Sequence, residues 1–193
     1  MTVCFLSVTV GSVNDLPMLK ERGIFSLFDE VIRNQWRLDV ISADRNAPTL
    51  DDFVQHLTVG GVKVFWAFAG KENVLATAIK AQLRALHSVA PVFAGAMDWE
   101  GLYASLYKPA GIAIGSAGPG LDGAFNTALL ACEVVALNDP FVAERLKKYY
   151  EQTAKSAVYR IDPESIQLEK SPDGKERVQD RGLCKVSSGW HIR

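Results

Sequence analysis

The sequence predicts a doubly wound α/β fold, in which helices cover both faces of a parallel sheet. Two near-continuous apolar runs, Val3 to Val10 and Val62 to Ala69, are typical of strands that are buried on both faces. Segments whose apolar residues recur at helical spacing alternate with such runs along the chain. This alternation produces βα units, which join parallel strands through right-handed connections.

The predicted elements follow one another from the N-terminus to about residue 155. Five strands are predicted, at residues 3–10, 37–42, 62–69, 90–94 and 111–114. Helices are predicted at residues 15–32, 49–57, 73–86, 98–106, 124–137 and 139–155. Asn14 or Asp15 is predicted to cap the first helix, Thr49 the second, and Asp98 and Asp139 two later ones.

The pattern changes after Ala157, where polar and apolar residues alternate around a turn sequence, Ser171 to Gly174. We therefore expect an α/β domain at residues 1–157 and a C-terminal extension at residues 158–193. The extension is predicted to form a small antiparallel hairpin or meander. The alternative is a partly ordered surface tail.

Size and composition exclude several classes of protein. The chain has 193 residues, 48% of them hydrophobic, which suits one globular domain with an appendage and excludes wholesale disorder. The chain has 21 lysines and arginines against 22 aspartates and glutamates. It therefore lacks the excess of basic residues that is typical of proteins that bind nucleic acids non-specifically. No stretch reaches the roughly 18 apolar residues of a membrane helix. Three scattered cysteines, Cys4, Cys132 and Cys184, predict reduced thiols and a cytoplasmic location.

Three loops after predicted strands are candidates for a ligand site: residues 11–15, 42–46 and 69–73. In an open parallel sheet, ligands bind beyond the carboxyl ends of the strands, where the strand order reverses. If the order begins with the second, first and third strands, the three loops lie side by side.

The residues of these loops fit a phosphorylated ligand, although each also has a simpler explanation. Gly11 and Ser12 precede a helix N-terminus, which favours anions, but Ser12 could equally be a cap. Arg45 can bind a phosphate bidentately, or it can pair with Asp51 or Asp52. Asp44 could move protons from a sheltered cleft or bond locally. Neither a dinucleotide-binding fingerprint nor a P-loop is present.

The order of these loops along the chain, together with two later segments, resembles that of a known family. GSVND, at residues 11–15, takes the place of the family's G-S-x-S-D, and SADRNAP, at residues 42–48, takes that of its S-A-H-R-T-P. GLYASLYKPAGIAIG, at residues 101–115, and GAFNTALLA, at residues 123–131, are similar to two later segments. The chain thus resembles the PurE-like family of N5-carboxyaminoimidazole ribonucleotide mutases and aminoimidazole ribonucleotide carboxylases of purine synthesis.

The resemblance implies a flavodoxin-like three-layer sandwich and a homo-octamer whose active sites lie between subunits. Members of the family move a carboxyl group between the exocyclic nitrogen and a ring carbon of aminoimidazole ribonucleotide, by way of carbon dioxide, without a metal or an organic cofactor. Carried over to this sequence, the substrate-binding residues are Ser12, Asp15, Ser42, Arg45, Gly70 and Lys71.

The sequence departs from the family pattern in two places, and both concern residues that the resemblance places in the active site. Asp44 replaces the family's proton-carrying histidine, and we expect it to take that role. The third loop lacks the family's glycine run, because Phe68 and Lys71 replace glycines. Glycines let the backbone approach a ligand closely, and Phe68 is expected to fill the space that the family's glycines leave open. Val74 stands where the family has a second histidine.

Three functions therefore remain open at the level of sequence. The first is an active isomerase or lyase of the mutase type, with Asp44 as proton carrier. The second is a repurposed member that acts on another phosphorylated small molecule. The third is a non-catalytic nucleotide-binding assembly protein.

Overall fold

The computed structural model describes residues 5–70 and 74–153 and four short strands at residues 159–160, 168–170, 176–178 and 184–185. Contacts within the chain divide it into two units, Met1–Tyr149 and Tyr150–Arg193. The domain boundary expected at residue 157 falls inside the second of these units and stays a prediction.

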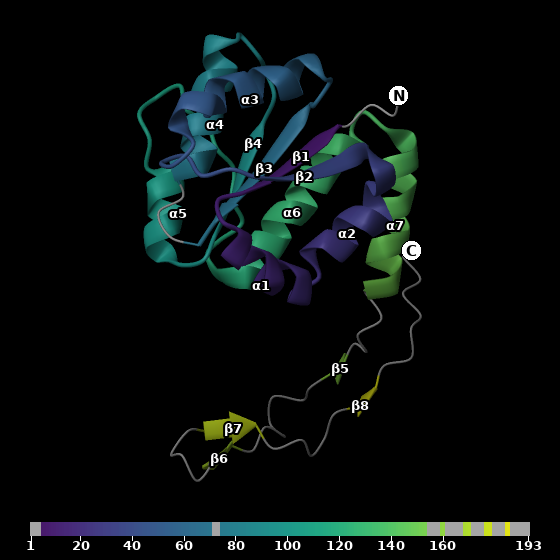
Figure 1. Ribbon diagram of the computed structural model, residues 1–193. Helices are drawn as coiled ribbons and strands as arrows, with labels where there is room; N and C mark the ends of the chain where they lie inside the picture. The colour runs from purple at the N-terminus through teal and green to yellow at the C-terminus, as the bar shows by residue number, and fades with distance from the viewer. Residues whose placement is uncertain are drawn as a thin grey trace. The chain divides into compact units, whose positions relative to one another are not determined.

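The first unit is built on a parallel sheet of four strands in the order β2-β1-β3-β4 (Figure 1). The strands are β1 (Leu6–Val10), β2 (Trp36–Val40), β3 (Val64–Ala69) and β4 (Val92–Ala96). The registers Val10↔Val40 and Val10↔Phe68 bring the carboxyl ends of β1, β2 and β3 to one edge of the sheet. The predicted α/β class and the order on which the loop argument depends are thus confirmed.

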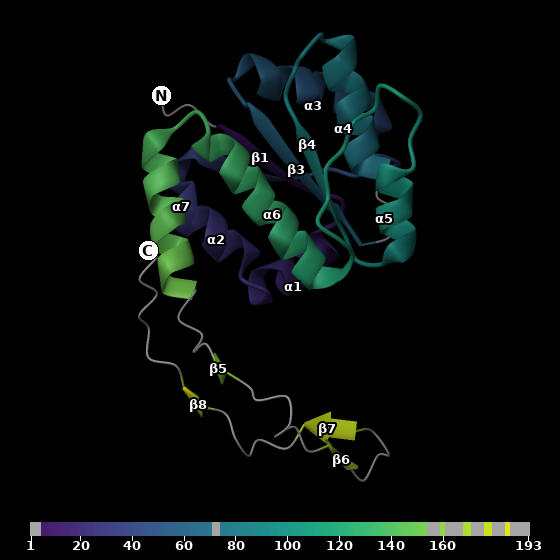
Figure 2. The same cartoon turned by 180° about the vertical axis from the view of Figure 1, so that it is seen from behind.

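Helices cover both faces of this sheet (Figures 1 and 2). One face packs against α1 (Leu16–Glu21), α2 (Ile24–Val31), α6 (Gly120–Ala136) and α7 (Pro140–Thr153). The other packs against α3 (Ala47–Val59) and α4 (Val74–Ala85), and α5 (Trp99–Leu106) lies against β4 and α4. The result is the three-layer sandwich that the resemblance implies.

The central strands are buried on both faces, as their apolar sequences predict. Every residue of β1 is buried. Leu6, Val8 and Val10 belong to the core beneath α2 and α6. Ser7 and Thr9 alternate with them on the opposite face, and their hydroxyl groups are hydrogen-bonded to each other at 3.1 Å. This bond satisfies two polar groups that burial would otherwise destabilise.

The predicted fifth strand, at residues 111–114, is wrong. The chain instead joins the edge of β4 slightly later, through two isolated parallel bridges, Phe93↔Gly115 and Ala96↔Pro119. Between these bridges Gly118 has a φ of 125°, and Pro119 has no N–H to donate. A continuous series of hydrogen bonds to β4 cannot form through such residues. The segment therefore runs beside β4 without becoming a strand.

Two further predictions need correction. The first long helix is divided into α1 and α2 at Gly23, whose φ of 84° ends α1 in the left-handed region. Thr49 does not cap the second helix, because α3 begins at Ala47, with Pro48 in its first turn. Asp98 and Asp139 do cap α5 and α7 as predicted, and their carboxylates accept from the N–H groups of Gly101 and Phe141 at 2.8 Å each.

The second unit contains two antiparallel strand pairs, which confirms the predicted hairpin character. β6 (Leu168–Lys170) pairs with β7 (Glu176–Val178), and β5 (Tyr159–Arg160) pairs with β8 (Cys184–Lys185). The predicted turn at residues 171–174 lies outside the described residues. In the part of the chain that the structure describes, no helix has the length and apolar character needed to cross a bilayer.

Candidate functional site

The first and second candidate loops meet at the carboxyl edge of the sheet. The guanidinium Nη2 of Arg45 donates a hydrogen bond to the carbonyl oxygen of Gly11 at 3.3 Å. This bond spans from the loop after β2 to the loop after β1. The predicted alternative, an ion pair of Arg45 with Asp51 or Asp52, is not formed among the described residues.

The first and third loops also lie in contact. The N–H of Gly11 donates to the carbonyl oxygen of Phe68 at 2.8 Å. A Cβ atom on Gly11 would lie 3.3 Å from the Cβ of Ala69, so the two loops approach each other closely at this glycine. The described part of the third loop ends at Gly70, and Lys71 lies outside the described residues. The structure therefore brings together Ser12, Asp15, Ser42, Asp44, Arg45 and Gly70.

The two serines of these loops hold the turns that follow them. Ser12 has extended backbone, and its Oγ accepts from the N–H of Asn14 at 3.2 Å. The Oγ of Ser42 accepts from the N–H of Arg45 at 3.3 Å. Both side chains are half-buried. A hydroxyl group that accepts one bond still has its own hydrogen to donate, so each serine can cap its turn and bind an anion.

The electrostatics of this edge favour a negatively charged ligand. Helices α3 and α4 follow strands that end here, so both begin near this edge. The N-terminus of a helix has a positive partial charge and free N–H groups. Arg45, whose side chain is exposed, shortly precedes α3 in the chain and reaches the carbonyl oxygen of Gly11. Together these features suit a negatively charged group such as a phosphate, and we call this part of the structure the anion-binding edge.

The carboxyl group of Asp15 is buried between the first and third loops. Its residue is 8% exposed, and it accepts a hydrogen bond from the backbone N–H of Gly70. Burial raises the pKa of Asp15 above 3.8, and the Gly70 N–H lowers it only in part. A Cβ atom on residue 70 would lie 2.7 Å from Oδ1 of Asp15. Sequence reasoning predicted Asp15 as a substrate-binding residue and missed its burial.

Asp44 has different surroundings. It lies in the turn of the second loop between Ser42 and Arg45, and its side chain is exposed. Its expected role as proton carrier stays a prediction.

The position of Phe68 corrects an expectation about the third loop. Its side chain does not fill space in the loop: it is fully buried beneath the sheet and stacks on Trp66, with ring centroids 6.0 Å apart. Alternation along β3 places Val64, Trp66 and Phe68 on the face that α6 covers. The mouth of the site is therefore not blocked by this aromatic ring.

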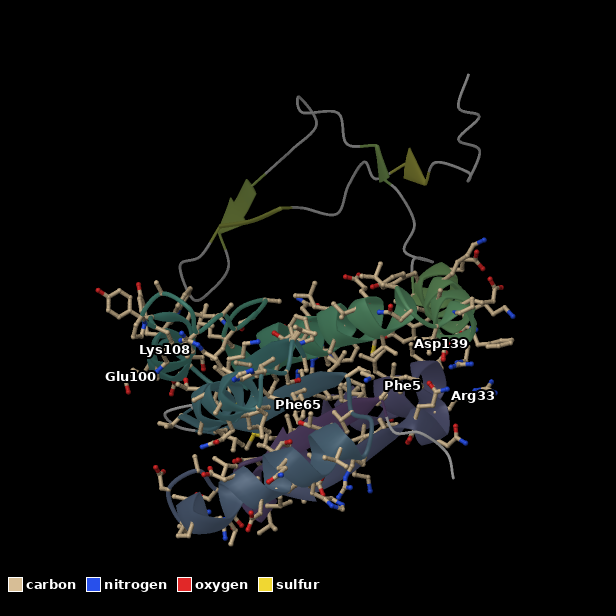
Figure 3. All side chains as sticks on the ribbon, turned by 90° about the horizontal axis from the view of Figure 1, so that it is seen from above. Phe5, Arg33, Phe65, Glu100, Lys108 and Asp139 are labelled. Atoms are coloured by element: carbon tan, nitrogen blue, oxygen red, sulfur yellow. The ribbon has the colours of Figure 1, made fainter. Side chains whose placement is uncertain are left out.

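Elsewhere in the described residues, we find no second group of side chains that could form a metal centre. A cavity of about 400 Å³ lies at the opposite edge of the sheet, with Phe5 and Asp139 among its lining residues. Figure 3 shows Phe5 and Asp139 at one end of the first unit and Glu100 and Lys108 at the other. Among the described residues, no cluster of three or more histidines, cysteines or carboxylates could hold a metal ion.

Comparisons with known proteins agree with this geometry. A model of the family described as AIR carboxylase matches residues 6–156. An N5-carboxyaminoimidazole ribonucleotide mutase of Pyrococcus abyssi is 31% identical over 147 residues, which cover 76% of this chain and 82% of the relative. The enzyme of the same name from Escherichia coli K12 is 28% identical over 159 residues, covering 82% and 92% respectively.

A solved structure gives the same fold. The crystal structure of Treponema denticola PurE superposes with a TM-score of 0.63 and 21% sequence identity, and the match covers 78% of this chain and 92% of that one.

Proposed function

This chain belongs to the AIR carboxylase family, and from that membership we propose that it moves a carboxyl group on aminoimidazole ribonucleotide in purine biosynthesis. The observation that supports this most strongly is the convergence of the first, second and third loops at the carboxyl edge of the sheet. The relatives named above are mutases, which favours this activity over a repurposed enzyme or a non-catalytic assembly protein.

In the proposed complex, the phosphate of the ribonucleotide lies on the anion-binding edge. Arg45 binds it through its guanidinium group, and the hydroxyl groups of Ser12 and Ser42 donate to it. Gly70 and Lys71 border the same ligand from the third loop. These contacts would hold the base over the loops in a fixed orientation, so that the reacting nitrogen and carbon stay next to one carboxyl group.

The reaction class is an isomerisation, or a lyase reaction if carbon dioxide exchanges with solvent. A carboxyl group leaves the exocyclic nitrogen as carbon dioxide and joins a ring carbon. The nitrogen gains a proton and the carbon loses one, so the site needs a group that can both give and accept a proton. Asp15 on the first loop and Asp44 on the second are the two carboxyl groups that we consider for this role. Neither a metal nor an organic cofactor enters the proposed reaction.

We further propose a cytoplasmic homo-octamer, the assembly that the resemblance implies. Helix α5 and Tyr107, the residue that follows it, support self-association, because they present exposed aromatic side chains. Trp99 is 65%, Tyr103 65% and Tyr107 87% exposed. Apolar patches of this kind commonly mark protein–protein contacts. Light scattering coupled to size-exclusion chromatography tests the assembly, and a monomer would contradict it.

Turnover tests the function. The purified protein is mixed with N5-carboxyaminoimidazole ribonucleotide, and the conversion is followed by ultraviolet absorbance. We expect turnover by the unmodified chain and a large loss in Arg45→Ala. A folded protein that binds the ribonucleotide without converting it would favour the assembly protein. Absence of both binding and conversion would favour a different phosphorylated substrate.

A further inference from the structure

We propose that Asp15, rather than Asp44, is the proton carrier of this site. The inference rests on the proposed function, and it names the group that performs the proton transfer. The observation behind it is geometric: Asp15 places a buried carboxyl group where the first and third loops meet, at the edge where the ligand is proposed to bind.

The contact with Gly70 fixes this carboxyl group in place. The N–H of Gly70 donates to it, and the space that a side chain on residue 70 would occupy is filled by the carboxyl oxygen, 2.7 Å from the ideal Cβ position. Although Asp15 immediately precedes α1, its side chain makes no capping bond to that helix. The carboxyl group is therefore directed across to the third loop rather than used to hold its own helix.

The carboxyl group of Asp44 is neither buried nor fixed by a contact with another loop. Its side chain is exposed, and the local capping bonds of its loop are made by Ser42 and Asn46, which accept from the N–H groups of Arg45 and Ser42. Among the described residues, no bond orients the carboxyl group of Asp44. Proton transfer needs a carboxyl group that is held in position next to the reacting atoms, and the exposed side chain of Asp44 is not held.

The surroundings of Asp15 favour the acid form that a proton donor needs. Burial disfavours the charged carboxylate and so raises the pKa of Asp15, against the opposing effect of the Gly70 N–H. Within the described ranges, no charged side chain contributes to this shift. The N–H of Gly70 uses one acceptor position of the carboxyl group, which leaves its O–H available to a ligand.

The proposed step balances. The acid form of Asp15 gives its proton to the exocyclic nitrogen while the bond from that nitrogen to the carboxyl carbon breaks, and its electron pair stays on nitrogen. Carbon dioxide is released. The ring carbon then forms a bond to carbon dioxide, and the Asp15 carboxylate takes the proton that this carbon loses. The carrier returns to its starting form, and nothing is oxidised or reduced.

The test compares Asp15→Asn with Asp44→Asn in the turnover assay. Asparagine keeps an oxygen that can accept from Gly70 but cannot carry a proton. General acid–base catalysis is worth about 10²–10⁴-fold, so we expect Asp15→Asn to lower kcat by at least about 10²-fold and Asp44→Asn to lower it far less. Asp52→Asn, an exposed change on α3, is the control and keeps full turnover. The inference is overturned if Asp44→Asn loses as much as Asp15→Asn, or if Asp15→Asn remains active.

A second measurement does not depend on turnover. The titration of the Asp15 carboxyl carbon is followed by nuclear magnetic resonance in the unmodified protein, with Asp15→Asn identifying its signal. We expect Asp15 to titrate above the ordinary range of aspartate, and a midpoint at or below 3.8 overturns the inference. If the unmodified protein shows no turnover, the proposed function fails, and this titration alone decides whether Asp15 is a proton-holding group.

Discussion

The guanidinium group of Arg45 donates a hydrogen bond to the carbonyl oxygen of Gly11, 3.3 Å away, and thereby joins the loop after β2 to the loop after β1. The two residues are separated by a whole βα unit of sequence. Their contact holds the guanidinium group of Arg45 against the start of the first loop. This relationship brings two of the three loops together at the edge of the sheet where we propose that the phosphate binds.

Arg45→Ala is expected to weaken ribonucleotide binding by about 10-fold or more, which corresponds to about 1.4 kcal/mol. Arg45→Lys should recover only part of this loss, because a lysine cannot bind a phosphate in the same bidentate way. Calorimetric titration with aminoimidazole ribonucleotide measures both. Lys148→Ala, an exposed change on α7, is the control. Equal affinities for Arg45→Ala and the unmodified chain would remove Arg45 from the site.

Gly70→Ala should disturb the site more than Gly11→Ala. A Cβ on residue 70 would lie 2.7 Å from Oδ1 of Asp15, so the buried carboxyl group must move, whereas a Cβ on residue 11 meets the Ala69 Cβ at 3.3 Å. Crowding of this kind costs about 1–3 kcal/mol of stability. Thermal melting and turnover together measure the effect. A Gly70→Ala protein as stable and active as the parent would show that the carboxyl group is not held there.

The stability of the protein should depend on the ionisation of Asp15. Because the pKa of Asp15 is raised in the folded state, its stabilising contribution is complete below the unfolded value of 3.8 and is lost as pH rises through the folded value. Above that value the parent protein must bury an ionised carboxylate, which is unfavourable, whereas the amide of Asp15→Asn stays uncharged at every pH. The free energy of unfolding of the variant, relative to that of the parent, should therefore increase between pH 3 and pH 7. Urea unfolding at both values measures this, and a decrease would contradict the raised pKa.

Thr127→Val should loosen the loop that crosses the edge of β4. The buried hydroxyl of Thr127 donates to the carbonyl oxygen of Gly123 at 2.7 Å and accepts from the N–H of Ala117 at 2.9 Å. Valine keeps the shape but leaves that N–H without its partner, at a cost of about 1–3 kcal/mol. Thr58→Val is a matched comparison, because the Thr58 hydroxyl donates to the carbonyl of Val54 in its own helix. A smaller loss in Thr127→Val than in Thr58→Val would contradict this role.

Asp139→Ala should destabilise α7 by about 1 kcal/mol, while Asp139→Asn retains most of the cap. Burial alone would raise the pKa of Asp139, but bonds from the N–H groups of Val142 and Phe141 outweigh it and lower the pKa below 3.8. The charge-dependent part of the cap is therefore present above 3.8 and is lost as pH falls through the folded value. Thermal melting at neutral and acidic pH measures this, and equal losses at both would contradict it.

The sequence predicted the layers of the fold well, because burial on both faces leaves a direct trace in composition. The apolar runs at β1 and β3 and the helix caps at Asp98 and Asp139 required no tertiary information. The segment after Pro109 did not behave as a strand, because whether it pairs with β4 depends on backbone angles at Gly118 and on the missing N–H of Pro119. Such features are invisible to an apolar-run argument.

The meeting of the three candidate loops could also be predicted from the sequence, because it depends only on the order of the strands. The positions of Ser12, Ser42 and Arg45 followed from the order of three loops, which the sheet confirms. The contrast between Asp15 and Asp44 did not, because both are aspartates near a helix N-terminus. Their difference arises from Gly70, which follows another strand, β3, and whose backbone approaches only Asp15.

Transfer of an isotopically labelled carboxyl carbon tests the central claim most directly. N5-carboxyaminoimidazole ribonucleotide, labelled in the carboxyl group on its exocyclic nitrogen, is incubated with the purified protein and followed by nuclear magnetic resonance. The account predicts that the label appears on the ring carbon, and that it does so more slowly with Arg45→Ala than with the unmodified chain. A label that stays on nitrogen, or leaves at the uncatalysed rate, would contradict the proposed activity while leaving the fold and its anion-binding edge unchanged.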